Sequence, residues 1–176
     1  GKPLSKSYEY DLRGNRVKME EGENDSLIQD VESYQYDLNN RLTEVDAQVY
    51  DFNTSNAGVL SEQYSDRYYY DNNGNMTARQ TTQTVSGTSS QSNMDLSGHG
   101  AGSGLEIYRY DAFNRLSGYY TGETKASYTY NANNLRASKT VNNTKTDFVW
   151  NGQNLAAESR DSGVNTYTHD ITGIHT

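Results

Sequence analysis

Aromatic residues recur in pairs with one residue between them, and this spacing is the most regular feature of the chain. The pairs are Tyr8 and Tyr10, Tyr34 and Tyr36, Tyr68 and Tyr70, Tyr108 and Tyr110, Tyr128 and Tyr130, and Phe148 and Trp150. A β-strand places residues two apart on one face, whereas a helix separates them by about 200°. Each pair therefore predicts a strand with both rings on the same face of a sheet.

Each pair is followed by residues that favour a turn. Asp or Asn comes first, at Asp11, Asp37, Asp71, Asp111, Asn131 and Asn151. Gly or Asn comes three residues later, at Gly14, Asn40, Gly74, Asn114, Asn134 and Asn154. The first side chain can bond to the backbone two residues on, and the later residue can adopt a positive φ.

An apolar residue then returns the chain to the sheet, at Val17, Leu42, Met76, Leu116, Leu135 and Leu155. Strand, turn and strand together predict a β-hairpin of about 20 residues per unit. The turns have two spellings, DLRGNRV and DNNGNMT against DLNNRLT and DAFNRLS. The second spelling reaches its apolar residue one position earlier than DLRGNRV does, which predicts a different turn or a bulge there.

The repeat predicts an all-β module over residues 1–176, built from tandem antiparallel hairpins. Units start near residues 8, 34, 68, 108, 128 and 148, and a degenerate unit, YTHDITGIHT, starts at Tyr167. Residues 20–33 and 51–63 are interpreted as insertions between units. Residues 80–104 are polar and rich in Gly and Ser, which predicts a flexible loop.

Composition changes this picture in two ways. Only 32% of residues are hydrophobic and the mean hydropathy is -0.99, but sixteen tyrosines can supply apolar rings with polar tips. The net charge is -8 without a basic stripe, which argues against nucleic-acid binding. Cysteine is absent and no stretch of about 20 apolar residues occurs, so neither a disulfide framework nor a membrane span is predicted. The chain begins with Gly1, and we interpret it as a piece of a longer protein.

The candidate chemical groups have simpler structural interpretations. The recurring Asp residues could ligate calcium, but calcium loops gather several oxygens in one segment, and Asn replaces Asp in two units. Turn formation explains both residue types, so we predict no metal site, no cofactor and no catalytic residue. His99, His169 and His175 are expected on the surface or in loops. Exposed tyrosine rows could instead stack on sugar rings, which keeps a carbohydrate-binding surface open.

The units YEYDLRGNR, YQYDLNNRL, YYYDNNGNM, YRYDAFNRL and YTYNANNLR resemble the YD repeat of the RHS family. That family includes bacterial wall-associated RHS proteins, cocoon subunits of Tc-type toxins and teneurins. The resemblance implies hairpins aligned edge to edge in a long twisted or spiralling sheet, part of a hollow shell that in bacterial members encloses a C-terminal toxin or other cargo. The D-P-x-G motifs linked to self-cleavage in that family are missing, because Pro3 is the only proline.

The sequence thus favours a non-catalytic structural module of a secreted or surface-exposed bacterial protein. Its partners would be other YD repeats of the parent protein and a C-terminal toxin or effector, and its open sheet edges would favour self-association. The alternative is a carbohydrate-binding or cell-adhesion module that presents tyrosine rows. An enzyme is the third hypothesis. The structural repeat residues are taken to be Tyr8, Tyr10, Asp11, Gly14, Tyr34, Tyr36, Asp37, Tyr68, Tyr70, Asp71, Gly74, Tyr108, Tyr110, Asp111, Tyr128, Tyr130, Asn131, Leu135 and Trp150.

Overall fold

The protein forms antiparallel β-strands throughout the part that is described. The computed structural model describes residues 5–22, 28–51, 59–85, 104–170 and 173–175. The strands are β1 (Ser5–Tyr10), β2 (Arg16–Gly22), β3 (Ile28–Tyr36), β4 (Leu42–Asp51), β5 (Val59–Tyr70), β6 (Met76–Val85), β7 (Gly104–Tyr110), β8 (Leu116–Tyr120), β9 (Lys125–Tyr130), β10 (Arg136–Val141), β11 (Thr144–Asn151), β12 (Asn154–Arg160), β13 (Gly163–Thr166), β14 (Thr168–Asp170) and β15 (Gly173–His175).

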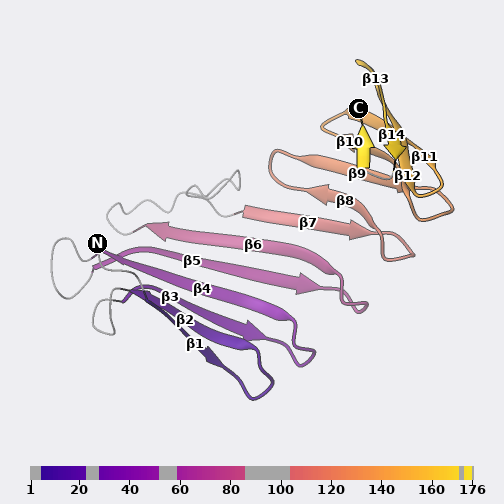
Figure 1. Cartoon of the computed structure of the whole chain (residues 1–176). Helices are drawn as coiled ribbons and strands as arrows, with labels where there is room; N and C mark the ends of the chain where they lie inside the picture. The colour runs from indigo at the N-terminus through magenta and orange to yellow at the C-terminus, as the bar shows by residue number, and fades with distance from the viewer. Residues whose placement is uncertain (1–4, 23–27, 52–58, 86–103, 171–172, 176) are drawn as a thin grey trace. The chain divides into compact units, whose positions relative to one another are not determined.

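Strands β1 to β13 are hydrogen-bonded in sequence order in one open sheet, and β14 pairs with β15 in a separate hairpin (Figure 1). This arrangement confirms the predicted all-β fold of tandem antiparallel hairpins. The protein divides into two compact units, residues 1–106 and 107–176. In the first unit the turns of hairpins β1–β2, β3–β4 and β5–β6 lie at the same end of the sheet (Figure 1).

All five Asp/Asn turns up to Asn131 have the same length, so the two predicted turn types are wrong. In each hairpin a bulge follows, and the second tyrosine of the pair lies opposite the residue six positions later: Tyr10 and Arg16, Tyr36 and Leu42, Tyr70 and Met76, Tyr110 and Leu116, Tyr130 and Arg136. Leu42, Met76 and Leu116 each lie five positions after the Asp of their turn and open a return strand, whereas Val17 lies six positions after Asp11 and Leu135 four positions after Asn131. The apolar pattern therefore does not mark the strand-opening positions of the first and fifth units. Those positions are in fact held by Arg16 and Arg136.

The sixth unit has a shorter turn than the other five. Trp150 lies opposite Leu155, and Asn151 lies opposite Asn154, which leaves a two-residue connection between β11 and β12. Gly152 has φ 62 at the first of these positions, as in the type II′ turns common in hairpins. The positive φ predicted for Asn154 is therefore wrong, since this residue already belongs to β12.

The strands extend into segments that the sequence assigned to connectors. Strand β3 begins at Ile28 and β5 at Val59, inside the two predicted insertions. Residues 80–85 continue β6 and residue 104 begins β7, so only the middle of the predicted loop, 86–103, remains, and it lies outside the described residues. The predicted unit at Tyr167 does contain a hairpin, but this hairpin stands apart from the main sheet. Polar strands such as IQDVESY escape sequence analysis because they lack a hydrophobic alternation.

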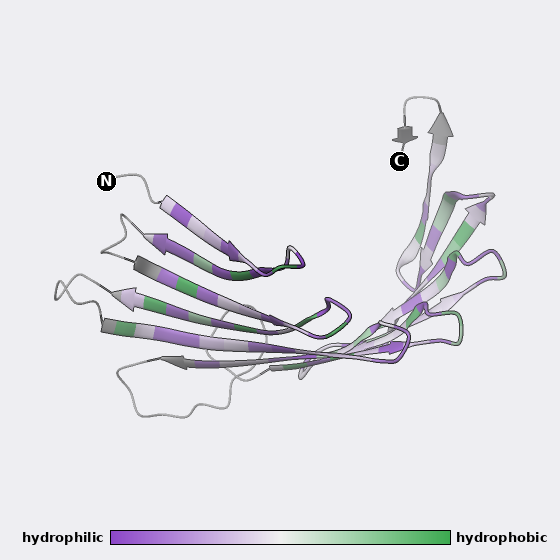
Figure 2. Cartoon of the chain, turned by 90° about the horizontal axis from the view of Figure 1, so that it is seen from below, coloured by the Kyte–Doolittle hydropathy of each residue, from purple (hydrophilic) through white to green (hydrophobic). Residues whose placement is uncertain are grey.

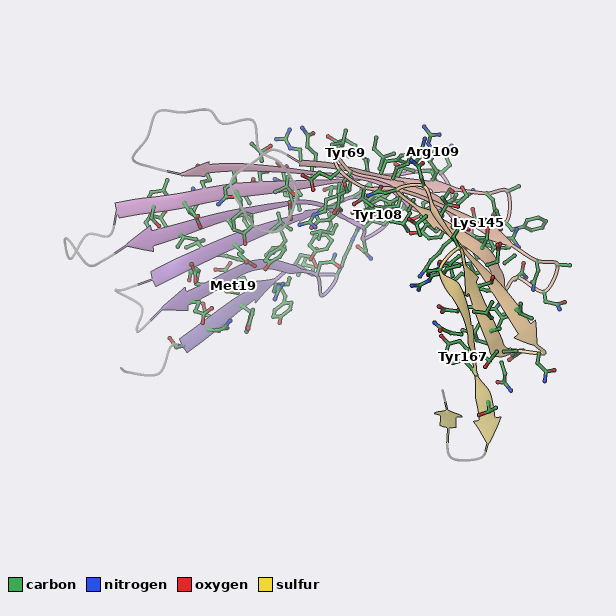
Figure 3. All side chains as sticks on the ribbon, turned by 90° about the horizontal axis from the view of Figure 1, so that it is seen from above. Met19, Tyr69, Tyr108, Arg109, Lys145 and Tyr167 are labelled. Carbon is green, nitrogen blue, oxygen red and sulfur yellow. The ribbon has the colours of Figure 1, made fainter. Side chains whose placement is uncertain are left out.

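The sheet has a thin core on its tyrosine face, which is the face that carries the paired tyrosines such as Tyr34 and Tyr36. In the first unit Met19, Tyr34 and Val45 are buried together, and Tyr36, Leu42 and Tyr68 pack against them. Among the described residues no large side chain is fully buried. Figure 2 shows hydrophobic positions as short separate patches, and Figure 3 shows the side chains of the first unit, Met19 among them, on a single layer of strands. Since little apolar area is buried, polar contacts contribute an unusually large share of the stability of this fold.

Candidate functional site

The Asp or Asn that follows each tyrosine pair organises its turn through one side-chain oxygen. In the turn at Asp71, Oδ1 accepts hydrogen bonds from the backbone N–H groups of Asn73 and Asn75, both at 2.9 Å. The backbone closes the turn, because Gly74 donates to the Asp71 carbonyl at 3.1 Å and Asp71 donates to the Asn75 carbonyl at 2.9 Å. The same four contacts recur in the turns that begin at Asp11, Asp37, Asp111 and Asn131.

The left-handed residue of each turn lies three positions after the Asp or Asn. Gly14 and Gly74 have φ values of 86 and 88, and Asn40, Asn114 and Asn134 have values between 59 and 63. Gly and Asn are the residues that adopt this conformation at least cost. Gly and Asn can therefore replace each other at this position along the repeat, because both meet the requirement for a positive φ.

The choice between Asp and Asn at the head of the turn depends on the residue four positions later. The second carboxylate oxygen, Oδ2, accepts from Asn15 and Asn75 at 2.9 Å and from the Nε atoms of Arg41 and Arg115 at 2.7 Å. In the fifth turn this later residue is Leu135, which offers no side-chain donor. A carboxylate there would have one oxygen without this partner, whereas Asn131 keeps Oδ1 as acceptor and carries no charge.

These contacts lower the pKa of each turn carboxylate. For Asp11, Asp71 and Asp111 the largest cause is the side-chain hydrogen bond from the residue four positions on, and for Asp37 it is the backbone N–H of Arg41. The aspartates are therefore held ionised as hydrogen-bond acceptors. A general acid would need the opposite shift.

The second aromatic residue of a pair connects its hairpin to the one before. The hydroxyl of Tyr36 donates to the Arg16 carbonyl at 3.0 Å, and Tyr70 and Tyr130 donate to the Leu42 and Leu116 carbonyls at 2.8 Å. At the next junction Trp150 replaces tyrosine, and its Nε1 donates to the Arg136 carbonyl at 2.8 Å. In all four cases the acceptor is the first residue of the preceding return strand, beside the bulge. We call this the inter-hairpin aromatic contact.

The first aromatic residue of a pair acts through its ring face. The guanidinium of Arg16 lies 4.4 Å from the ring centroid of Tyr34, and that of Arg136 lies 4.5 Å from the ring of Tyr128. Tyr108 packs against Tyr119 across the strand pair, with centroids 5.2 Å apart. Phe148 occupies this position in the sixth unit without a hydroxyl, and Lys139 lies over its ring. Cation–π and ring contacts of this kind need no phenol.

Arginine side chains connect neighbouring turns: Arg13 donates to the Leu38 carbonyl at 3.2 Å, and two further arginines combine such a contact with ring stacking. Arg41 and Arg115 each bond their own Asp and lie 4.7 Å over the second tyrosine of the next unit, Tyr70 and Tyr130. Their Nη1 atoms continue to the next turn, at the Asp71 carbonyl and at Asn134 Oδ1. Sequence reasoning missed Arg41 and Arg115, although the D-x-x-N-R spelling in both turns was a visible signal.

A polar cluster lies farther along the tyrosine face of the first unit. Glu32 accepts hydrogen bonds from the hydroxyls of Tyr34 and Tyr64, the latter at 3.1 Å. Asp66, which is 6% exposed, accepts from Arg79 at 2.7 Å and from Thr81. Burial and then the charge of Glu32 raise the pKa of Tyr64 to about 12, and the pKa of Tyr34 is raised mainly by burial. The phenols are thus stabilised in the protonated form, which makes them poor bases or nucleophiles.

The first tyrosine pair makes fewer of these contacts: the Arg16 guanidinium lies 5.7 Å from the ring centroid of Tyr8, and no ring contact of Tyr10 is found in the described segments. Tyr8 and Tyr10 belong to β1, an edge strand of the sheet, and are 46% and 61% exposed. No hydrogen bond from the Tyr10 hydroxyl is found within the described segments. Leu135 does not begin the return strand as predicted, but lies partly buried inside the turn.

The described residues contain no group of three or more His, Asp or Glu side chains placed to hold a metal ion. His99 lies outside the described residues. No helix that could cross a membrane is present in the described segments. A scan of the sequence against protein-family models finds no match, and neither does a search of curated proteins. The function therefore has to be inferred from the geometry of the repeat.

Proposed function

We propose that this protein is a structural module without catalytic activity, in which neighbouring hairpins within each compact unit dock through the same small set of contacts. The observation that carries the proposal is the inter-hairpin aromatic contact, which recurs at four junctions with distances of 2.8–3.0 Å. A tandem array of this kind gains stability from nearest-neighbour contacts, because an isolated hairpin is only marginally stable.

The resemblance of the repeat to YD repeats extends this proposal. A sheet assembled from such units would form part of a twisted or spiralling shell that scaffolds, encloses or presents a C-terminal toxin or effector of a secreted or surface-exposed bacterial protein. Two features favour a structural role over a catalytic or binding role. The turn carboxylates accept hydrogen bonds from backbone N–H groups, and the phenols of the polar cluster donate hydrogen bonds to carboxylates. The side chains that recur most regularly are thus used for holding the sheet.

The shell hypothesis can be tested on the full-length protein that carries this sequence. Limited proteolysis should leave the region C-terminal to residue 176 protected in the wild type. In a Tyr36→Phe, Tyr70→Phe, Tyr130→Phe variant the same region should be cleaved faster, because three inter-hairpin contacts are lost. Rapid cleavage of that region in the wild-type protein would contradict enclosure, although the hairpin module could still act as an open scaffold.

Carbohydrate binding is the second candidate, and the exposure of Tyr8 and Tyr10 favours it. Exposed rings two residues apart on one strand face could stack on successive sugar rings. A glycan array with the wild type and a Tyr8→Ala, Tyr10→Ala variant tests this directly. Saturable binding that is lost in the variant supports adhesion, and an array without binding removes it. Tyr69→Ala, at the exposed position between the tyrosines of another pair, is the matched control.

A further inference from the structure

Two Asn–Gly dipeptides occur in the sequence, and the structure treats them differently. They are Asn73–Gly74 in the third hairpin and Asn151–Gly152 in the sixth. The amide nitrogen of a glycine can attack Cγ of a preceding asparagine, because no Cβ hinders the approach. The reaction requires the nitrogen to leave its hydrogen bonds and the backbone to rotate. Local structure therefore decides which site reacts.

The first dipeptide is held inside an Asx turn. The amide of Asn73 donates to Asp71 Oδ1 at 2.9 Å, and the amide of Gly74, which would be the nucleophile, donates to the Asp71 carbonyl at 3.1 Å. The following residue, Asn75, is bound to both carboxylate oxygens of Asp71. Rotation about the Asn73–Gly74 segment would have to break this set of contacts together.

The second dipeptide lies at the tip of the two-residue turn between β11 and β12. Asn151 and Asn154 form the last strand pair, and residues 151–154 are all exposed. A Cβ built on Gly152 would meet no atom within 4 Å, and the same holds for Gly74, so steric access is equal at the two sites and only the hydrogen bonds differ. Within the described segments no side-chain hydrogen bond to or from Asn151 is present. This turn lacks the Asx cap that locks the other five.

We propose that Asn151 is a site of spontaneous deamidation and that Asn73, with the same neighbour, is protected by Asp71. The nitrogen of Gly152 attacks Cγ of Asn151 and forms a new bond to it. The bond between Cγ and Nδ2 then breaks, and ammonia leaves with the displaced proton. Water opens the cyclic imide at either carbonyl, which yields aspartate or isoaspartate. No oxidant, metal or second protein takes part.

The product alters the hairpin as well as the charge. Each event adds one negative charge to a protein whose net charge is -8. Isoaspartate also inserts one extra backbone atom at the residue that pairs with Asn154. The neighbouring Trp150 makes the inter-hairpin aromatic contact with Arg136, so the modification lies next to a junction between hairpins. The extent of modification at residue 151 would therefore increase with the age of the folded protein, and the modification would weaken the sixth hairpin.

The test follows both sites in one molecule. Native protein is incubated at mildly alkaline pH, digested with trypsin at lower pH and analysed by mass spectrometry, because the two sites fall in separate peptides, 146–160 and 68–79. Deamidation at Asn151 should be about tenfold faster than at Asn73. This factor corresponds to the free energy that is lost when the hydrogen bonds to Asp71 break. In concentrated urea the two rates should converge, since the dipeptides are chemically alike.

Variants separate protection by Asp71 from other causes. Asp71→Ala should accelerate deamidation at Asn73 in the folded protein, whereas Asp71→Asn, which keeps an Oδ1 acceptor, should do so much less. Asn151→Gln should abolish the signal in peptide 146–160 attributed to residue 151. Equal rates at Asn73 and Asn151 in the native wild type would overturn the proposal without any variant. So would an unchanged rate at Asn73 in a folded Asp71→Ala protein, judged by its circular dichroism.

Discussion

The hydroxyl of Tyr130 donates a hydrogen bond to the backbone carbonyl of Leu116, 2.8 Å away and one hairpin earlier. The acceptor lies beside the bulge, where the ladder of the preceding hairpin is locally disrupted. An unpaired carbonyl that is partly buried costs free energy, so the phenol supplies what the bulge removes. This relationship explains why the second ring of a pair carries a hydrogen-bond donor, as tyrosine or as Trp150.

Tyr130→Phe is expected to lower the free energy of unfolding by about 0.5–1.5 kcal/mol, the range for one hydrogen bond. The matched control is Tyr128→Phe, because the contact of Tyr128 with Arg136 uses the ring face and survives the change. Urea denaturation followed by circular dichroism measures both. Equal losses in the two variants would show that the hydroxyl at position 130 has no special role.

The pairing of Asn131 with Leu135 can be tested by a double-mutant cycle. Asn131→Asp alone should destabilise the protein slightly, because the new carboxylate oxygen lacks the donor that Arg115 provides for Asp111. Leu135→Arg alone loses partly buried apolar area. The double variant recreates the Asp–Arg spelling of the fourth turn, and a favourable coupling of about 0.5 kcal/mol or more is expected for residues in contact. Additive effects would mean that the residue four positions on does not influence the choice of Asp or Asn.

Gly74→Ala should cost about 1 kcal/mol, because φ is 88 at this position although a Cβ would have no neighbour within 4 Å. Gly74→Asn should cost clearly less, since Asn40, Asn114 and Asn134 hold the equivalent conformation in sister turns. Thermal unfolding of the two variants separates backbone strain from crowding. If both variants melt together, conformational strain at this position is not the reason for the Gly and Asn alternation.

The pH dependence of stability has three expected parts. The turn aspartates have lowered pKa values, so their stabilising contribution is present above the ordinary pKa of about 4 and is lost as the pH falls through the lower folded values. Burial, followed by the charges of Glu21 and Glu32, raises the pKa of Asp30, so Asp30→Asn should stabilise the protein at neutral pH. Tyr64, with its pKa raised to about 12, contributes stability that is present below about pH 10 and is lost as the pH rises through the folded value.

Urea midpoints measured from about pH 3 to pH 11 test these signs. The fall at acid pH should be shallower in Asp71→Asn than in the wild type. The loss above about pH 10 should be reduced in Tyr64→Phe. A wild-type midpoint that stays constant between about pH 5 and pH 3 would contradict the role assigned to the turn carboxylates.

Edge-to-edge association of the isolated module remains a prediction, and β1 is the strand to test. All six of its side chains are exposed, and it is one of the two edge strands of the main sheet, with β13 at the other edge. A Ser7→Pro substitution should remove association, because proline blocks pairing on a sheet edge. Light scattering over a concentration series compares it with the wild type. A wild type that stays monomeric at every concentration would refute the prediction.

Much of the local structure could be inferred from the sequence. The two-residue spacing of Tyr128 and Tyr130 placed them on one strand, and the following Asn131 and Asn134 placed the turn, because an Asx turn is complete within five residues. Errors arose where a local pattern had two alignments. The apolar pattern predicts Leu135 at the start of a return strand, whereas the backbone register gives that place to Arg136. The sixth turn was misjudged because WNGQN looks like its sisters but closes sooner.

The sequence by itself determined the first five turns, their positive-φ residues and the strands that carry the tyrosine pairs, because these depend on neighbours within a few positions along the backbone. Only the tertiary structure decided which partner each side chain meets. Tyr64 reaches Glu32, Tyr130 reaches the Leu116 carbonyl, and Arg41 stacks on Tyr70 because the pairing of successive hairpins brings distant residues side by side. That pairing also separates Tyr34, 8% exposed inside the sheet, from Tyr8, half exposed at its edge, although both stand in the same repeat. The difference lies in the number of neighbouring strands, which the sequence of a single unit does not specify.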